Sequence, residues 1–158
     1  MAVVTFDELK AMTGSIIGVS DWLTVDQDMI NKFADATGDH QFIHVNPDMA
    51  ALTPFGGTIA HGFLSLSLMP VLTQKTDMPR MDGIKMGVNN GGNKTRFLAP
   101  VRSGKRVRGH FKLLEIAEKR PGQYQQTVEY TLEIESEDKP ALIAEWVSQF
   151  FIDRKSVV

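Results

Sequence analysis

The most apolar stretch of this 158-residue chain is TIAHGFLSLSLMPVLT, residues 58–73. It contains no acidic residue, lysine or arginine, and Leu64, Leu68 and Leu72 recur at the spacing of one helical face. An apolar segment that also lacks charge on its other face predicts a buried helix rather than an amphipathic surface helix. Pro70 is expected to end or bend this helix, because proline donates no backbone hydrogen bond.

From residue 84 onward the periodicity changes from helical to alternating. The turn sequences Arg-Pro-Gly at 120–122 and Glu-Asp-Lys-Pro at 137–140 separate segments that predict long antiparallel strands. One apolar helix followed by such strands predicts an α+β fold in which the sheet wraps around the helix, the hotdog fold. The alternating residues are Val107, Gly109, Phe111 and Leu113, then Val128, Tyr130, Leu132 and Ile134, then Leu142, Ala144 and Trp146.

The residues before the apolar stretch predict short elements. A capping-box pattern begins a helix over residues 6–13, and residues 15–23 are typical of a strand. The pattern recurs at residues 24–27, where it begins a second helix that ends near Gly38.

Composition predicts a single globular domain over residues 1–158, with 42% apolar and 23% charged residues. No run approaches the roughly 18 to 20 apolar residues that a membrane-spanning helix needs. The first ten residues show neither a basic region nor an apolar core of an export signal, so a cytoplasmic location is expected. The chain has no cysteine, which excludes disulfides, thiolate nucleophiles and cysteine-bound metals.

Charge is unevenly distributed along the chain. The net charge of −2 argues against general nucleic-acid binding. Between Asp82 and Glu115, however, there is no acid. The basic residues of this stretch form either the solvated face of strands paired with acids elsewhere or a surface for an anionic carrier, such as a phosphorylated cofactor or an acyl carrier protein. They are Lys85, Lys94, Arg96, Arg102, Lys105, Arg106, Arg108 and Lys112.

Residues 37–48, TGDHQFIHVNPD, carry the densest group of reactive side chains. Asn46 and Pro47 are typical of an N-cap and first helical residue, so the motif before them is predicted to be a loop. On such a backbone Asp39 and His44 could converge on one water molecule and act as a proton-transfer pair. The alternative is structural, since Gly-Asp is a common turn dipeptide and an isolated histidine often packs or caps.

A metal site is a further interpretation of the same segment. His40 and His44 are four residues apart, with Asp35, Asp39 or His61 as possible additional ligands. Side chains at this spacing lie on one face only in a helix, whereas the flanking residues predict a loop, and the usual zinc spacings are absent. We therefore expect no metal.

His61 and Gly62 lie near the start of the apolar helix. Backbone N–H groups at a helix start lack intrahelical acceptors and face the positive end of the helix dipole, so they can stabilise an oxyanion. Glycine would let a ligand approach the backbone closely. The alternative is that Gly62 only allows the helix and sheet to pack tightly.

Three ordered motifs resemble the MaoC-like dehydratase family, whose best-known members are (R)-specific enoyl-CoA hydratases, and in particular its nodulation protein N-like branch. They read FADATGDHQFIHVNPDMA, FGGTIAHGFLSLSL and NKTRFLAPVRSG, and the resemblance covers about residues 15 to 150. Gln41 and Phe42 replace the asparagine and proline usual in the first motif. The third motif often opens with a tyrosine, where this chain has Asn89-Asn90-Gly91-Gly92.

The resemblance implies hydration of trans-2-enoyl thioesters to (R)-3-hydroxyacyl thioesters, or the reverse. Asp39 and His44 would then be the catalytic pair, with the Gly62 N–H as oxyanion donor. Ser67 and Arg96, in the second and third motifs, are predicted as further substrate-binding residues. A CoA or acyl-carrier-protein thioester is the expected substrate, and no cofactor is expected.

Two other functions remain open at this stage, a hotdog thioesterase and a non-catalytic acyl-binding subunit. The spacing of Asp39 and His44 argues against a thioesterase. The departures at Gln41, Phe42 and Asn90 are the feature that keeps a binding subunit as an alternative. The resemblance also implies a homodimer joined edge to edge, with each acyl tunnel formed between subunits, and the alternative assembly is a dimer of dimers. The apolar segment 146–152 is expected to be covered by such a partner.

Overall fold

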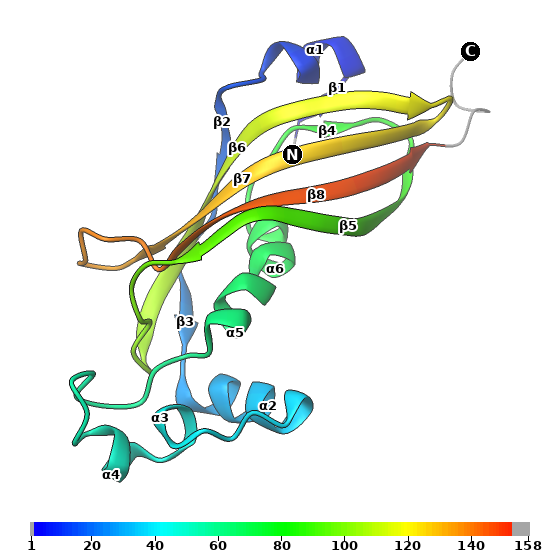
Figure 1. Cartoon of the computed structure of the whole chain (residues 1–158). Coiled ribbons are helices and arrows are strands. Elements are labelled where there is room, and N and C mark those ends of the chain that lie inside the picture. The colour runs from blue at the N-terminus through cyan, green and yellow to red at the C-terminus, as the bar shows by residue number, and fades with distance from the viewer. Residues whose placement is uncertain (1, 153–158) are drawn as a thin grey trace.

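The computed structural model describes residues 2–152, and its centre is a six-stranded sheet (Figure 1). The strand order is β2-β6-β7-β8-β5, with β3 also paired to β6, and these pairings are antiparallel. The strands are β2 (Ile16–Val19), β3 (Leu23–Val25), β5 (Ile84–Phe97), β6 (Lys105–Arg120), β7 (Gln123–Ile134) and β8 (Leu142–Ile152). The predicted strands and turns of the C-terminal half are confirmed, and β5 joins them beside β8 as the edge of the sheet.

The core lies between one face of this sheet and the apolar stretch. Alternate residues of β6 and β7 are buried, as the period of two predicts. Phe111 and Tyr130 stack with ring centroids 5.5 Å apart, and the Tyr130 hydroxyl donates to the Ser65 carbonyl. Leu64, Leu68 and Leu72 are all buried against this layer, as their spacing predicts.

The apolar stretch forms two short helices rather than one. They are α5 (Gly62–Ser67) and α6 (Met69–Gln74), with Pro70 in the first turn of α6. The predicted break is confirmed, and proline fits there because first-turn N–H groups need no intrahelical acceptor. The prediction of burial on all sides is wrong for a single chain, since Phe63 is 67% exposed. One face of α5 packs on the sheet and the other is uncovered.

The N-terminal half follows its predicted order with shifted boundaries. Helix α1 (Phe6–Ala11) begins with the predicted capping box. The predicted strand is divided into β2 and β3, and Asp26, not Thr24, caps α2 (Gln27–Thr37). Thr24 is held in β3 opposite Arg106, so the Asp26 carboxylate accepts the hydrogen bond from the Met29 N–H.

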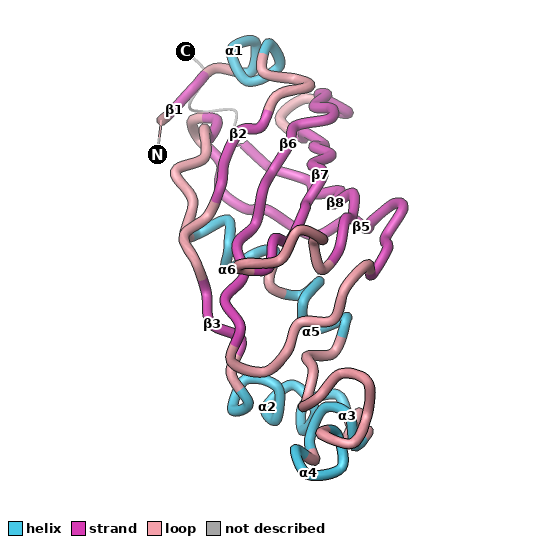
Figure 2. Tube along the Cα trace, turned by 90° about the vertical axis from the view of Figure 1, so that its left-hand side faces the viewer, coloured by secondary structure: helices cyan, strands magenta, loops and turns pink. Residues whose placement is uncertain are grey.

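Beyond one end of the sheet, helices α2, α3 (Phe42–Val45) and α4 (Pro47–Ala50) lie together (Figure 2). Gly38 ends α2 in the left-handed conformation, and Asn46 caps α4 as predicted. The prediction of an uninterrupted loop between Gly38 and Asn46 is wrong, because one helical turn forms at α3. Strands β1 (Val3–Val4) and β4 (Arg80–Met81) form a separate parallel pair. Within residues 2–152, no helix has the length and apolar character to cross a membrane.

Candidate active site

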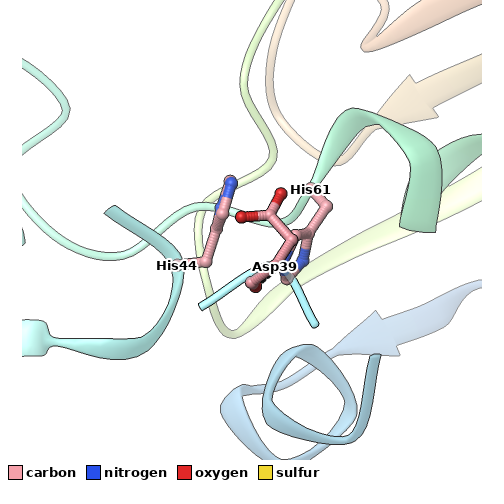
Figure 3. Close-up of side chains that lie close together, drawn as sticks. All are labelled: Asp39, His44 and His61. Carbon is pink, nitrogen blue, oxygen red and sulfur yellow. Dashed lines mark hydrogen bonds between the residues drawn. The ribbon is translucent and has the colours of Figure 1, made fainter. Parts of the chain in front are cut away.

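Three segments of the chain bring reactive side chains to one place beyond the end of the sheet. Asp39 follows the end of α2, His44 lies on α3, and His61 immediately precedes α5. One side-chain ligand atom from each lies within 4.8 Å of the other two. The Asp39 carboxylate points toward the His44 ring (Figure 3). The structure thus brings together the two residues predicted as a pair and adds His61.

The surroundings of the His44 imidazole select one tautomer of its neutral ring. The side chain is buried, and Nδ1 lies 2.7 Å from the Ile59 carbonyl oxygen. A carbonyl oxygen only accepts, so Nδ1 carries the hydrogen and Nε2 of the neutral ring keeps a lone pair. Such a nitrogen can accept a proton from water.

Asp39 is exposed, and its Oδ1 accepts a hydrogen bond from the Gln41 N–H at 3.2 Å. No direct hydrogen bond joins the Asp39 and His44 side chains, both of which lie within the described part of the chain. Groups separated by up to 4.8 Å can share one water molecule bound at about 2.8 Å from each. The arrangement therefore suits a carboxylate and an imidazole that act on the same water.

Gln27 fixes α3 in place. Its Nε2 donates to the His44 carbonyl oxygen at 2.7 Å, and its Oε1 accepts from the Thr58 hydroxyl at 2.5 Å. The Ile59 N–H, next to Thr58, donates to the Ile43 carbonyl. These hydrogen bonds connect three parts of the chain. They are the start of α2, helix α3 with His44, and residues 58–59, whose Ile59 carbonyl accepts from His44 Nδ1. Sequence reasoning missed Gln27, because its partners lie 17 and 31 positions away.

Gly62 is the first residue of α5, as predicted, and lines a cavity of about 310 Å³ together with His44. A Cβ atom at Gly62 would lie 3.0 Å from the Phe97 ring, which lines the same cavity. Tight packing therefore also explains glycine here, beside the predicted oxyanion role. The two explanations are compatible, since Gly62 and Phe97 both line the cavity that contains His44.

The remaining histidine of the motif points elsewhere. His40 Nε2 lies 2.8 Å from Asp35 Oδ1 on the surface, and this hydrogen bond raises the pKa of His40.

The relative orientation of His44 and His61 bears on metal binding, because their rings stack with centroids 3.8 Å apart and an interplanar angle of 26°. Lone pairs lie in the ring plane, so near-parallel rings direct them poorly toward one ion. The geometry favours proton transfer over metal binding, and the absence of a metal stays a prediction.

Ser67 and Arg96 do not line the His44–Gly62 cavity. The Ser67 hydroxyl donates to the Phe63 carbonyl at 2.7 Å, and Ser67 borders a separate cavity beside Trp146. Arg96 is exposed, and its Nη1 donates to the Thr95 carbonyl. Their predicted contact with substrate is untested within one chain and stays a prediction.

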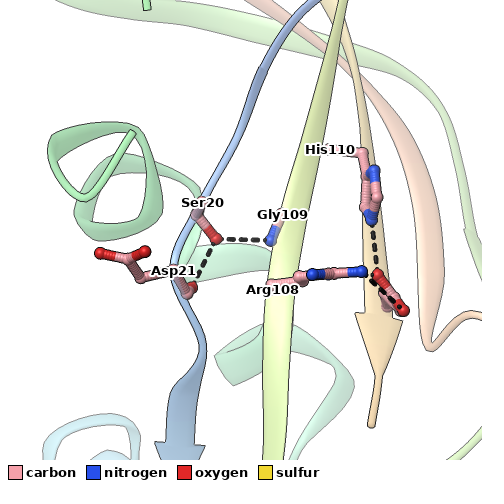
Figure 4. A network of polar contacts seen from close by, with 6 residues as sticks. Ser20, Asp21, Arg108, Gly109 and His110 are labelled. Atoms are coloured by element: carbon pink, nitrogen blue, oxygen red, sulfur yellow. Dashed lines mark hydrogen bonds and ion pairs between the residues drawn. The ribbon is translucent and has the colours of Figure 1, made fainter. Parts of the chain in front are cut away.

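Part of the basic stretch pairs with carboxylates near the end of strand β7 and just after it. Arg108 and His110 both contact the Glu133 carboxylate at 2.6 Å, and Arg106 pairs with Glu135 (Figure 4 shows Arg108 and His110). The Arg108 hydrogen bond lowers the pKa of Glu133. The solvated-face interpretation is confirmed for Arg106 and Arg108. For the other basic residues, binding of an anionic carrier stays a prediction.

Comparisons with known proteins show which family the chain resembles. Residues 9–137 match the family model described as MaoC like domain. The chain is 46% identical to Nodulation protein N of Rhizobium meliloti, covering 94% of this chain and 92% of that protein. It is 47% identical to 3-hydroxyacyl-thioester dehydratase Z of Mycobacterium tuberculosis, covering 90% and 93%.

Solved structures confirm the hotdog fold. An R-hydratase from Pseudomonas aeruginosa superposes with a TM-score of 0.70 at 20% identity, covering 89% of this chain and 83% of that one. Since the family model spans most of the chain and the relatives align over nearly their whole length, the chain belongs to the MaoC-like dehydratase family.

Proposed function

We propose that this protein adds water to trans-2-enoyl thioesters to give (R)-3-hydroxyacyl thioesters, or catalyses the reverse dehydration. The observation that carries the proposal is the placement of the Asp39 carboxylate beside the His44 imidazole, at the start of the helix that begins with Gly62. The 47% identity to a protein named as a 3-hydroxyacyl-thioester dehydratase supports the same reaction class.

The reaction needs a proton acceptor for water and a proton donor for the α-carbon on the same face of the substrate. Asp39 and His44 would bind one water between them. As its oxygen bonds to C3 and the C2–C3 π bond breaks, one proton passes to the pair, and the pair then delivers a proton to C2. Water is thus added across the double bond, and the pair returns to its starting protonation state.

Negative charge develops on the thioester oxygen before C2 is protonated. The Gly62 N–H at the start of α5 would donate to this oxygen, and the bond would strengthen as the enolate forms. Because the interaction is stronger in the transition state than in the bound substrate, it would accelerate the reaction rather than only increase affinity.

Crotonyl-CoA tests the proposal directly. Hydration removes the absorbance of the conjugated thioester without releasing a free thiol, whereas a thioesterase releases thiol and a binding subunit does neither. Loss of absorbance without thiol is the expected result, and no loss with crotonyl-CoA or longer enoyl-CoAs would overturn the proposal. A chelator is expected to leave the rate unchanged, because no step uses a metal.

CoA or acyl-carrier-protein thioesters are the proposed substrates, in keeping with the cytoplasmic location expected from the sequence.

The active form would be a homodimer joined through β5. This strand lies at the sheet edge over 14 residues, most of them exposed, and Met86 and Val88 are apolar residues exposed along it. Segment 146–152 is not itself the edge of the sheet, because β8 has β7 and β5 as neighbours, and the covering of its apolar side chains by a partner stays a prediction.

Light scattering at micromolar concentration tests the assembly. The expected mass is twice that of the 17.6 kDa chain. A fully active species with the mass of one chain would overturn both the dimer and a tunnel shared between subunits.

A further inference from the structure

His61 is a buried ionisable side chain that the proposed reaction does not use. It is 2% exposed, and its ring lies between two others. The Phe33 ring of α2 contacts it with centroids 4.9 Å apart and an angle of 54°, and His44 stacks on it at 3.8 Å. Its ring therefore fixes the plane in which the His44 imidazole can lie.

The polar atoms of His61 have unequal surroundings. Nε2 lies 2.9 Å from the Asp39 carbonyl oxygen, which only accepts, so Nε2 carries a hydrogen and donates it. Nδ1 is buried and has no hydrogen-bond partner among residues 2–152. An unsatisfied buried polar atom costs on the order of 1–3 kcal/mol. A phenylalanine would fill the same space without that cost, so packing alone does not explain histidine here.

The donated hydrogen bond distinguishes His61 from a phenylalanine at this position. It holds the backbone of Asp39, in a loop whose end is attached to α3. Through its ring the same residue supports His44, and through the peptide bond it sets the start of α5 at Gly62. One side chain thus contacts both proton-transfer residues and adjoins the oxyanion donor.

We infer that His61 is a positioning residue that sets the separation of Asp39 and His44, its Nε2–H holding the Asp39 backbone and its ring face holding the His44 imidazole. The inference rests on the proposed hydratase function. A displacement of about 1 Å between reacting groups can cost on the order of 10²-fold in rate. Loss of both contacts should therefore lower kcat strongly without a matching change in KM, because the CoA and acyl groups would bind elsewhere.

Three substitutions separate the two contacts. His61→Phe keeps the stacked ring and loses the donor, His61→Gln can keep a donor near the Nε2 position and loses the ring, and His61→Ala loses both. We expect kcat for crotonyl-CoA hydration to fall about 10²-fold in His61→Ala and about 10-fold in each of the others. His61→Phe should be at least as stable as the wild type in thermal unfolding, because it removes the unsatisfied Nδ1.

His40→Ala is the matched control, since His40 is an exposed histidine of the same motif. Its kcat should equal that of the wild type.

The outcomes separate the positioning role from the proposed function. Inactive wild-type protein would refute the proposed function. Active wild type with His61→Ala within two-fold of it would overturn only the positioning role. If His61→Ala unfolds, the space-filling variants decide: kcat within two-fold of wild type in both would overturn the inference, and reduced kcat in folded His61→Phe would support it.

Discussion

The strands β6 to β8 and the segment between Asp26 and Gly62 are held in place by different interactions. In the strands, alternate apolar side chains such as Phe111 and Leu132 are fully buried, and antiparallel ladders of backbone hydrogen bonds join the strands. In the segment, side chains of Gln27, His44 and His61 bond to backbone carbonyls across turns and short helices.

This difference predicts a division of roles. Burial of apolar area is nondirectional and supplies most of the folding free energy, so changes in the strands should act mainly on stability. Hydrogen bonds fix orientation more than they add net stability, so changes in the segment should act mainly on the rate of reaction. Measuring the free energy of unfolding and kcat for the same variants tests this division of roles.

The largest effect is expected at the proton-transfer pair. Asp39→Asn and His44→Asn should each lower kcat by about 10²–10⁴-fold, because each removes a positioned acid or base. The asparagine at position 44 can still donate to the Ile59 carbonyl, so thermal unfolding should change little. Since the pair acts as a unit, the double variant should lose little more activity than the worse single variant. Near-wild-type turnover in either single variant would contradict the assignment.

The next largest effect is a loss of folding stability, and it is expected for changes in the strands. Leu132→Ala should lower the free energy of unfolding by about 2–5 kcal/mol, because it removes a fully buried side chain and leaves a cavity. The kcat of the folded fraction should be unchanged. Leu52→Ala makes the same substitution at a leucine that is 89% exposed and should change stability by less than about 0.5 kcal/mol. Equal effects of the two in denaturant titrations would refute the assigned core.

Gln27 provides an intermediate test in the segment. Gln27→Leu removes the donor to the His44 carbonyl and the acceptor of the Thr58 hydroxyl, so α3 should lose its fixed position. We expect kcat to fall about 10-fold, with a loss of stability of about 1–3 kcal/mol from the unpaired groups. The control is Gln123→Leu, which breaks a glutamine pair on the sheet. Its kcat should not change, and an equal decrease in both variants would argue against the division of roles.

The smallest expected effect is the acid dependence of the ion pairs on β6 and β7. Hydrogen bonding from Arg108 lowers the pKa of Glu133 in the folded state below its ordinary value of 4.5. The resulting stabilisation is present above about pH 4.5 and is lost as the pH falls through the folded-state pKa. Glu133→Gln should therefore be less stable than the wild type at pH 7, by no more than about 1 kcal/mol, with the difference shrinking in acid. A pH-independent difference in urea titrations would disprove this.

Sequence patterns predicted strands β6 to β8 better than they predicted the segment between Asp26 and Gly62. The period-two pattern from Val107 to Ile134 predicted β6 and β7 because one face of each is buried. The motif around Asp39 and His44 predicted that these two side chains lie close together. The cap at Asp26 was missed because pairing of Thr24 with Arg106 decides it. Contacts of Gln27 and His61 join residues 17 to 31 positions apart, a separation that no local periodicity reports.

Hydration of crotonyl-CoA in D₂O, followed by NMR analysis of the product, tests the proposed action of Asp39 and His44 most directly. If both groups act on one water at one face of the substrate, hydroxyl and deuteron add to the same side of the double bond. The product should then be (R)-3-hydroxybutyryl-CoA with deuterium in a single, syn position at C2. A mixture of C2 epimers or anti addition would contradict the paired role of Asp39 and His44, and the (S)-alcohol would contradict the proposed product.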